Sequence, residues 1–238
     1  KKGLDTIISL VFTCLAVFIN LIPAILNGQN IYAWSIITCV YITVMTLMLI
    51  EGLNVKCFAA GVGCVGGVLV AGALELILRD QIKMTGVLDS EWLYLYNLNP
   101  ENPIDLKAII FAMIIVGAVG AVMDVAMSIA SSLCEINEKS PDLPARELLK
   151  SGLTIGRDIM GTMANTLVLA YIGSALCCML LMVTYSSNVG QILNREQIAV
   201  EILQALAGSI GILAALPLTA LTSVLCLKPL NRIKRSVH

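Results

Sequence analysis

Charged residues are scarce in this chain. Only 13% of its 238 residues are Asp, Glu, Lys or Arg, whereas 58% are hydrophobic, and the mean hydropathy is +0.90. Soluble domains carry about 25% charged residues. The composition therefore excludes an ordinary soluble domain and indicates an all-α, polytopic membrane protein whose surroundings are the lipid bilayer.

The sequence also lacks an excess of positive charge. It has 15 basic and 16 acidic residues, so the formal net charge is −1. Proteins that bind nucleic acid carry a basic surface that neutralises phosphates. Nucleic acid is therefore excluded as a partner.

Histidine is nearly absent, because His238 is the only one. The eight cysteines contain no Cys-x-x-Cys spacing, and most fall within or beside apolar runs. Zinc and iron sites need clustered Cys and His ligands, whereas isolated cysteines in apolar runs behave as small buried side chains. We expect no metal site and no cofactor.

Long apolar runs dominate the chain, and about 20 such residues cross a bilayer as a helix. Six segments qualify, which predicts one transmembrane domain over residues 1–238: about 5–27, 31–51, 57–78, 107–132, 158–184 and 199–227. Residues 133–157 are rich in charge and are predicted to form a connection outside the membrane. Because the first residue is Lys1 rather than methionine, we expect the natural protein to have a further N-terminal portion.

The basic residues are unevenly divided between the two sides of these spans. All 15 fall on one side except four: Arg79, Lys83, Lys107 and Arg195. An excess of Lys and Arg marks the cytoplasmic side. We therefore expect both termini in the cytoplasm, which is consistent with an even number of spans.

The segment from Gly61 to Gly66 matches the dinucleotide-binding pattern Gly-x-Gly-x-x-Gly. That pattern is informative only between a strand and a helix, and here it lies inside a continuous apolar run. Gly63 and Gly67 are also spaced as Gly-x-x-x-Gly, which lets membrane helices approach closely. We interpret these glycines as helix-packing residues.

A carboxylate, Asp124, lies well inside the fourth span, at a depth of about 12 Å. Ionisable residues at such depth are costly, and they usually mark ion paths or binding sites. Residues three, four and seven apart share a helix face, so Asp124 shares its face with Ser128 towards the cytoplasm and with Gly117 and Gly120 in the other direction.

The fifth span carries a matching stripe of small and polar residues. It contains Gly161, Asn165 and Thr166, and it begins with Arg157 and Asp158 at the membrane boundary. Two polar stripes in lipid are most easily satisfied when they face each other.

We predict an antiparallel register for the two stripes. It pairs three sets of residues: Asp124 with Asn165, Ser128 with Gly161, and Ser131 with Asp158.

The sixth span is predicted to form a third wall beside these two helices. Gly208, Gly211, Ala215 and Thr219 recur at helical spacing, and Pro217 can kink the helix. Helix packing alone is a second interpretation of the glycines, Ser128, Asn165 and Thr166, since small and polar residues commonly join membrane helices.

Four motifs resemble the YibE/F-like family of bacterial multi-spanning membrane proteins: GAVMDVAMSIASSL at 120–133, SGLTIGRDIMGTMANTL at 151–167, AYIGS at 170–174, and AGSIG at 207–211 followed by Pro217. The resemblance implies a multi-pass protein of the bacterial cytoplasmic membrane. Family members occur in related E and F forms, which implies a partner membrane protein of the same family.

A more remote resemblance is to the membrane half of SecD and SecF, which are ion-driven export components. The shared features are an aspartate in one span, a charged connection, and an Asn-Thr step in the next span. On this resemblance Asp124 occupies the region of a proton-path carboxylate. The fuller motifs of SecD and SecF are missing, and the second and third spans would be an inserted pair.

These observations leave three hypotheses. The first is an ion-coupled transporter or export-assisting component with an ion path at Asp124, Ser128, Asn165 and Thr166 and a cytoplasmic gate at Arg157 and Asp158. The second is a non-catalytic scaffold or subunit of a two-protein membrane complex, packed through Gly117, Gly120, Gly161, Gly208 and Gly211. The third, an intramembrane aspartyl protease, is disfavoured because two catalytic carboxylates must lie close together, whereas Asp158 is at the boundary. We expect no enzymatic activity.

Overall fold

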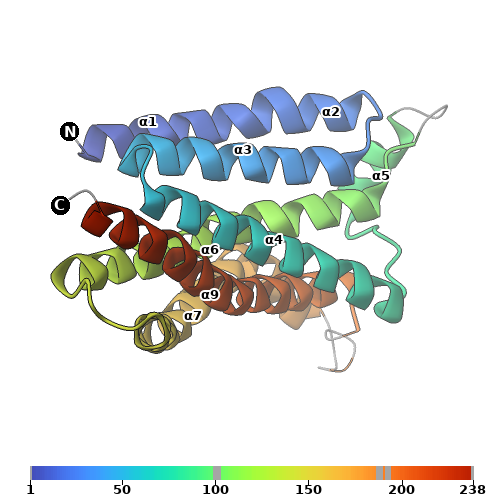
Figure 1. The fold of residues 1–238 in the computed structure, drawn as a ribbon. Helices are drawn as coiled ribbons and strands as arrows, with labels where there is room; N and C mark the ends of the chain where they lie inside the picture. The colour runs from blue at the N-terminus through green and yellow to red at the C-terminus, as the bar shows by residue number, and fades with distance from the viewer. Residues whose placement is uncertain (1, 99–102, 186–189, 191–193, 237–238) are drawn as a thin grey trace.

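In a computed structural model, the protein folds into a bundle of long helices (Figure 1). The structure describes residues 2–98, 103–185, 190 and 194–236, with the side chains of all of these except 2, 90, 185 and 230–236. Six of the described helices are long and apolar enough to cross a membrane. The chain is therefore a multi-pass membrane protein, and the predicted all-helical fold with six spans is confirmed.

The first span runs from Gly3 to Leu26 and changes helix type midway. It consists of α1 (Lys2–Leu15), a π-helical segment η1 (Ala16–Leu21) and α2 (Ile22–Leu26). The wider turn precedes Pro23, which has no N–H to donate, and the Ile22 N–H reaches the Val17 carbonyl instead. The first span is thereby continuous despite its proline.

The second span, α3 (Ile31–Glu51), follows the turn at residues 27–30. Asn30 caps it, because its Oδ1 accepts a hydrogen bond of 3.2 Å from the Ala33 N–H. The helix ends at Gly52, whose φ of 75° suits glycine. The predicted bounds of 31–51 match the structure.

The third span, α4 (Val55–Ile82), is longer than the predicted 57–78 and ends at Lys83, which is left-handed at φ 55°. A short helix, α5 (Ser90–Asn97), lies in the connection that follows. Its Trp92 packs beside buried residues of α4, α6 and α9.

The fourth and fifth spans, α6 (Leu106–Lys139) and α7 (Ala145–Tyr185), continue far into the predicted charged connection. Most of the predicted connection over 133–157 is therefore helical, because only residues 140–144 lie between the two helices. Its place outside the membrane stays a prediction. Charged residues support these helices: Lys139 Nζ lies 2.7 Å from Glu135 Oε1, one turn away. The break falls at Pro141 and Pro144, which cannot continue a helix.

The sixth span, α9 (Glu196–Ser236), contains Pro217 and Pro229 within one helix. In Figure 1, α1 and α3 lie side by side along one flank, α4, α6 and α9 form the middle, and α7 lies on the opposite side. The main buried cluster joins residues of α3, α4, α6, α7 and α9.

Glycines allow α4 and α9 to pack closely. A Cβ atom added at Gly67 would lie 2.6 Å from the Gly211 carbonyl oxygen, and one added at Gly63 would collide with the Thr219 side chain. Thr222 Oγ1 donates a hydrogen bond of 3.2 Å to the Ala59 carbonyl. The packing interpretation of the glycine-rich segment is confirmed. Gly211, Ala215 and Thr219 of the sixth span face α4, whereas Gly208 faces α6 and α7.

The start of α1 and the end of α9 lie at the same end of the bundle, which we call the terminal end; α5 lies at the other, the α5 end. This agrees with an even number of spans. Some residues used for the cytoplasmic assignment are not described: Lys1 lies outside the described residues, as do the side chains of Lys2, Arg232, Lys234 and Arg235. The orientation stays a prediction.

Candidate functional site

Asp124 lies on the exposed face of α6, in the middle of an otherwise apolar helix. Its neighbours Val122, Met123, Val125 and Ala126 are buried, whereas Asp124 and Gly120 are exposed. Within the described part of the chain, the Asp124 carboxylate makes no hydrogen bond and no ion pair. The carboxylate therefore faces outwards from this single chain, towards lipid or another molecule.

The hydroxyl groups near Asp124 are bonded within their own helices. Ser128 Oγ donates to the Asp124 carbonyl at 2.8 Å, and Thr166 Oγ1 donates to the Thr162 carbonyl at 2.9 Å. Such bonds to the preceding turn satisfy a hydroxyl in an apolar setting. These hydroxyls still have lone pairs to offer to a ligand or a neighbouring helix.

The matching stripe on α7 is also exposed. Gly161, Asn165 and Thr166 are all on the surface, and this helix is the least buried of the six spans, with 17% of its most apolar window inside the protein. The Asn165 carboxamide has no hydrogen-bond partner among the described residues. The two stripes thus lie on the outside of the bundle rather than facing each other in its interior.

Helices α6 and α7 do pack together, but about one turn away from the predicted register. A Cβ at Gly156 would lie 3.0 Å from Ile129 Cδ1, and a Cβ at Gly152 would lie 2.8 Å from Leu133 Cδ1. The prediction would have placed Ile129 beside Met160, which is four residues, or about 6 Å, further along α7. The proposed neighbours Ser128 and Gly161 are not in close contact, because a Cβ at Gly161 would meet nothing within 4 Å.

The five candidate packing glycines divide into two groups. A Cβ at Gly117 would lie 3.0 Å from the Tyr171 hydroxyl, one at Gly208 would lie 2.7 Å from Leu167 Cδ2, and Gly211 meets Gly67. Gly120 and Gly161 have open space beside them within this chain. Packing within one copy therefore explains three of these glycines and does not explain the other two, since no helix reaches them.

The two gate candidates, Arg157 and Asp158, are both exposed on α7. No ion pair joins either of them to another residue in the described ranges. Their position at the membrane boundary stays a prediction.

A second carboxylate inside the membrane escaped the sequence analysis. Glu75 of α4 is fully buried, with 0% of its surface exposed. Its nearest charged partner is Arg79, one turn later, whose Nε lies 3.9 Å from Glu75 Oε1. This distance is too long for a hydrogen bond, and neither carboxylate oxygen has a hydrogen-bond partner in the described structure.

The guanidinium of Arg79 is directed to α3 instead. Its Nη1 donates to the Tyr32 hydroxyl at 2.7 Å, and its Cζ lies 5.5 Å from the centre of the Tyr32 ring. The Tyr32 hydroxyl in turn donates to Asp105 Oδ2 at 3.3 Å. Phe111 packs edge-on against Tyr32 with ring centres 5.1 Å apart. This polar chain connects α3, α4 and the start of α6.

Asp105 also holds the first turn of α6. Its Oδ1 accepts from the N–H groups of Lys107 at 3.0 Å and Ala108 at 3.2 Å. Tyr32 and Asp105 both line a cavity of about 400 Å³ at the α5 end, together with the residues of the 28–31 turn and with Ile25, Pro103, Ile104 and Ala108. The polar chain that leads towards Glu75 therefore begins at the protein surface.

The signal for this cluster was present in the sequence. Glu75 and Arg79 stand four residues apart within and just beyond the predicted third span, and the criterion that selected Asp124 applies equally to Glu75. Tyr32 and Asp105 could not be found in this way, because they are distant in sequence and are brought together only by the packing of α3, α4 and α6.

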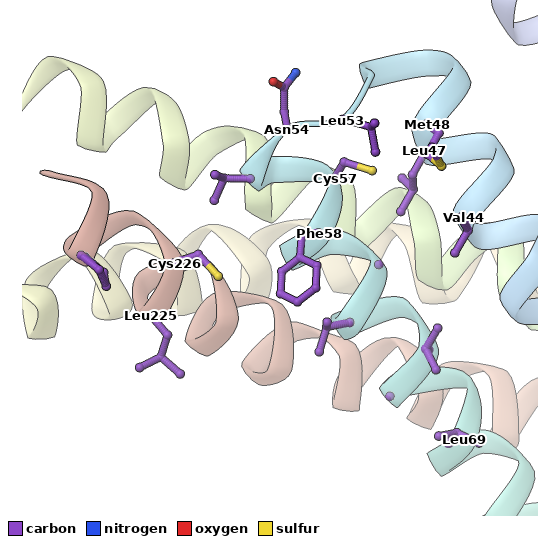
Figure 2. A pocket seen from close by; sticks show the side chains of 16 residues that line it. Val44, Leu47, Met48, Leu53, Asn54, Cys57, Phe58, Leu69, Leu225 and Cys226 are labelled. Carbon is purple, nitrogen blue, oxygen red and sulfur yellow. The ribbon is translucent and has the colours of Figure 1, made fainter. Parts of the chain in front are cut away.

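A larger, apolar cavity lies away from both carboxylates. It measures about 1000 Å³ and is formed by α3, α4 and α9 towards the terminal end, where Phe58, Leu225 and Cys226 line it (Figure 2). It contains neither Asp124 nor Glu75.

Comparison with known proteins identifies one family for this fold and site. A family model described as YibE/F-like protein matches residues 1–229. No curated protein matches the chain, and no solved structure matches it. The match includes every span, Asp124 and Glu75.

Proposed function

The chain belongs to the YibE/F-like family, and from this premise we propose that it is a subunit of an ion-coupled transport or export assembly in the bacterial cytoplasmic membrane. In this proposal both termini lie in the cytoplasm, and Asp124 binds and releases a proton or another cation. The remote resemblance to SecD and SecF belongs to the same proposal.

The observation that carries the proposal is the exposed position of Asp124 in the middle of α6. A carboxylate at the centre of a membrane helix costs about 2.5–3.5 kcal/mol on insertion scales. That cost falls if water or a polar neighbour reaches the carboxylate. Since no described side chain forms a hydrogen bond or an ion pair with this carboxylate, we infer that a second membrane protein covers the stripe and encloses a hydrated path.

The neighbouring polar groups have roles in this path. Ser128, Asn165 and Thr166 supply hydrogen bonds to the ion or its water, and Arg157 and Asp158 form the cytoplasmic mouth. The covering subunit is proposed to be a membrane protein of the same family. The proposal assigns no catalytic residue, metal or cofactor.

Ion flux tests this proposal. The assembly is purified from its native membrane through this chain and reconstituted into vesicles, and proton entry along an imposed gradient is followed with a pH-sensitive dye. We expect Asp124→Asn to reduce flux to the level of empty vesicles while the assembly stays intact. Asp5→Asn, a matched change near the start of α1, should conduct like the wild type. Normal flux through the Asp124→Asn assembly would refute the role of Asp124.

A second candidate function is a scaffold subunit in which the exposed stripe only binds a partner. The open space beside Gly120 and Gly161 favours it, because such glycines admit a neighbouring helix closely. A photo-crosslinking amino acid at position 161 in whole cells separates the possibilities. A protein adduct combined with normal flux in Asp124→Asn would support the scaffold, and adducts to lipid alone would exclude a partner at this stripe.

A further inference from the structure

Glu75 differs from ordinary buried carboxylates in having no donor. Buried ionised groups in proteins are normally paired and hydrogen-bonded. Here both oxygens of a fully buried side chain are without a hydrogen-bond partner. Arg79 is close enough to reach Glu75 but points its Nη1 at Tyr32, and its Nε also lacks an acceptor.

The environment of Glu75 is otherwise apolar. The titratable or charged groups that face it come from three places: Arg79 and Asp80 on α4, Tyr32 on α3, and Asp105 at the start of α6. On α9, the residues packed against this part of α4 carry no charge: Val200, Leu203 and Ala207. A carboxyl group in such a place is less costly to bury when it holds its proton, because the neutral acid needs no counter-ion.

A route connects this carboxyl to the surface at the α5 end. It runs from the cavity beside Asp105, through the Tyr32 hydroxyl, to the guanidinium of Arg79. The exposed residues Gln29, Asn30 and Asp105 line the mouth of the cavity. Exchange with the surrounding water therefore needs only local rearrangement of side chains.

We propose that Glu75 is a proton-binding site that exchanges its proton with the α5 end of the protein by way of Tyr32 and Asp105, with Arg79 positioned between Glu75 and Tyr32. When the O–H bond of the Glu75 acid breaks, the proton passes to water or to the Asp105 carboxylate. Arg79 then turns from Tyr32 to the newly ionised Glu75. Arg79 remains protonated throughout and acts as a positioning residue.

The site is separate from Asp124. Gly72 of α4 packs against Phe111 and Ile115 of α6, so Glu75 lies near the level of Ile110. Asp124 is about 14 residues further along α6, which is about 20 Å. The inference therefore stands whether or not Asp124 carries an ion.

Infrared spectroscopy of the full chain in lipid vesicles tests the proposal. Spectra recorded as the external pH is raised should show loss of the carbonyl band of a protonated carboxylic acid. Glu75→Gln should lack this change, and Asp124→Asn should keep the part that comes from Glu75. An identical spectral change in wild type and Glu75→Gln would overturn the proposal, as would a wild type with no protonated acid at any pH.

Two further arms keep the test decisive. If Glu75→Gln fails to fold, ¹³C-labelled glutamate separates Glu acids from Asp acids, because only a Glu acid shifts with that label, and a labelled Glu75→Asp chain should lack the shifted band. Tyr32→Phe keeps the ring and removes the hydroxyl, so after a pH jump the band should change more slowly while its final amplitude is unchanged. A Tyr32→Phe response as fast as that of the wild type would remove Tyr32 from the route.

Discussion

Gly67 of α4 and Gly211 of α9 meet so closely that a Cβ at Gly67 would lie 2.6 Å from the Gly211 carbonyl oxygen. In lipid, helix association depends on this kind of close packing rather than on the hydrophobic effect. The pair therefore fixes the separation of the two helices at the centre of the bundle.

Replacement of Gly67 should destabilise the whole bundle. Gly67→Ala would force α4 and α9 apart, and overpacking of this kind costs about 1–3 kcal/mol. Thermal unfolding in detergent, followed by circular dichroism, measures the loss. Gly173→Ala on α7 is the control, because a Cβ there meets nothing within 4 Å and alanine favours helix. Equal melting temperatures for Gly67→Ala and wild type would contradict the prediction.

The start of α6 should depend on an acceptor at position 105 and not on its charge. Asp105→Asn keeps an oxygen that can accept from the Lys107 N–H, whereas Asp105→Ala removes the cap, at a cost of about 1 kcal/mol. We expect the melting temperature to fall only for Asp105→Ala. Equal losses in both variants would show that the charge, rather than the cap, stabilises this end of the helix.

Two glycines on α7 should respond in opposite ways to leucine. Gly156→Leu should unfold the protein, because even a Cβ there would lie 2.5 Å from Leu216 Cγ. Gly161→Leu should leave the isolated chain folded, since that position is open, but should prevent a partner from docking on the stripe. Size-exclusion chromatography of the single chain and of the native assembly distinguishes the two effects. A Gly161→Leu chain that assembles normally would exclude a close partner at Gly161.

Lys228 should hold the short α6–α7 connection against the end of α9. Its Nζ donates to the Leu143 carbonyl at 2.5 Å and to the Pro141 carbonyl at 3.4 Å. Hydrogen bonds from charged donors contribute about 1.5–3 kcal/mol. For Lys228→Gln we expect faster amide exchange over residues 140–147, measured by mass spectrometry, with little change elsewhere. Lys150→Gln, a change at an exposed lysine, should leave exchange in this region unaltered.

Much of the fold could be predicted because hydropathy is a local property. The predicted second span, 31–51, has the bounds of α3, and these coincide with Asn30, which caps the start of the helix, and Gly52, which follows its end. The full lengths of α6 and α7 were not predicted, because hydropathy marks only the apolar part of a helix. Charged residues end the membrane-buried part of a helix, but they do not end the helix, as the Glu135–Lys139 pair shows.

The candidate site was harder to predict for a different reason. Helical periodicity correctly places Asp124 and Gly120 on one face, but it does not state whether that face is inside or outside the bundle. Whether the face lies inside or outside depends on which pairs of helices pack most closely. The glycines of α4 and α9 allow closer contact than the stripes of α6 and α7, so α9 occupies the interior and the stripes remain outside.

The lengths of α6 and α7 have a mechanical consequence. Their 34 and 41 residues correspond to about 51 Å and 61 Å, against a hydrocarbon thickness of about 30 Å. Both helices are therefore longer than is needed to cross the hydrocarbon layer, and only residues 140–144 join their adjacent ends. A force applied to this connection by a water-soluble protein would be carried by α6, which is one continuous helix, as far as Asp124.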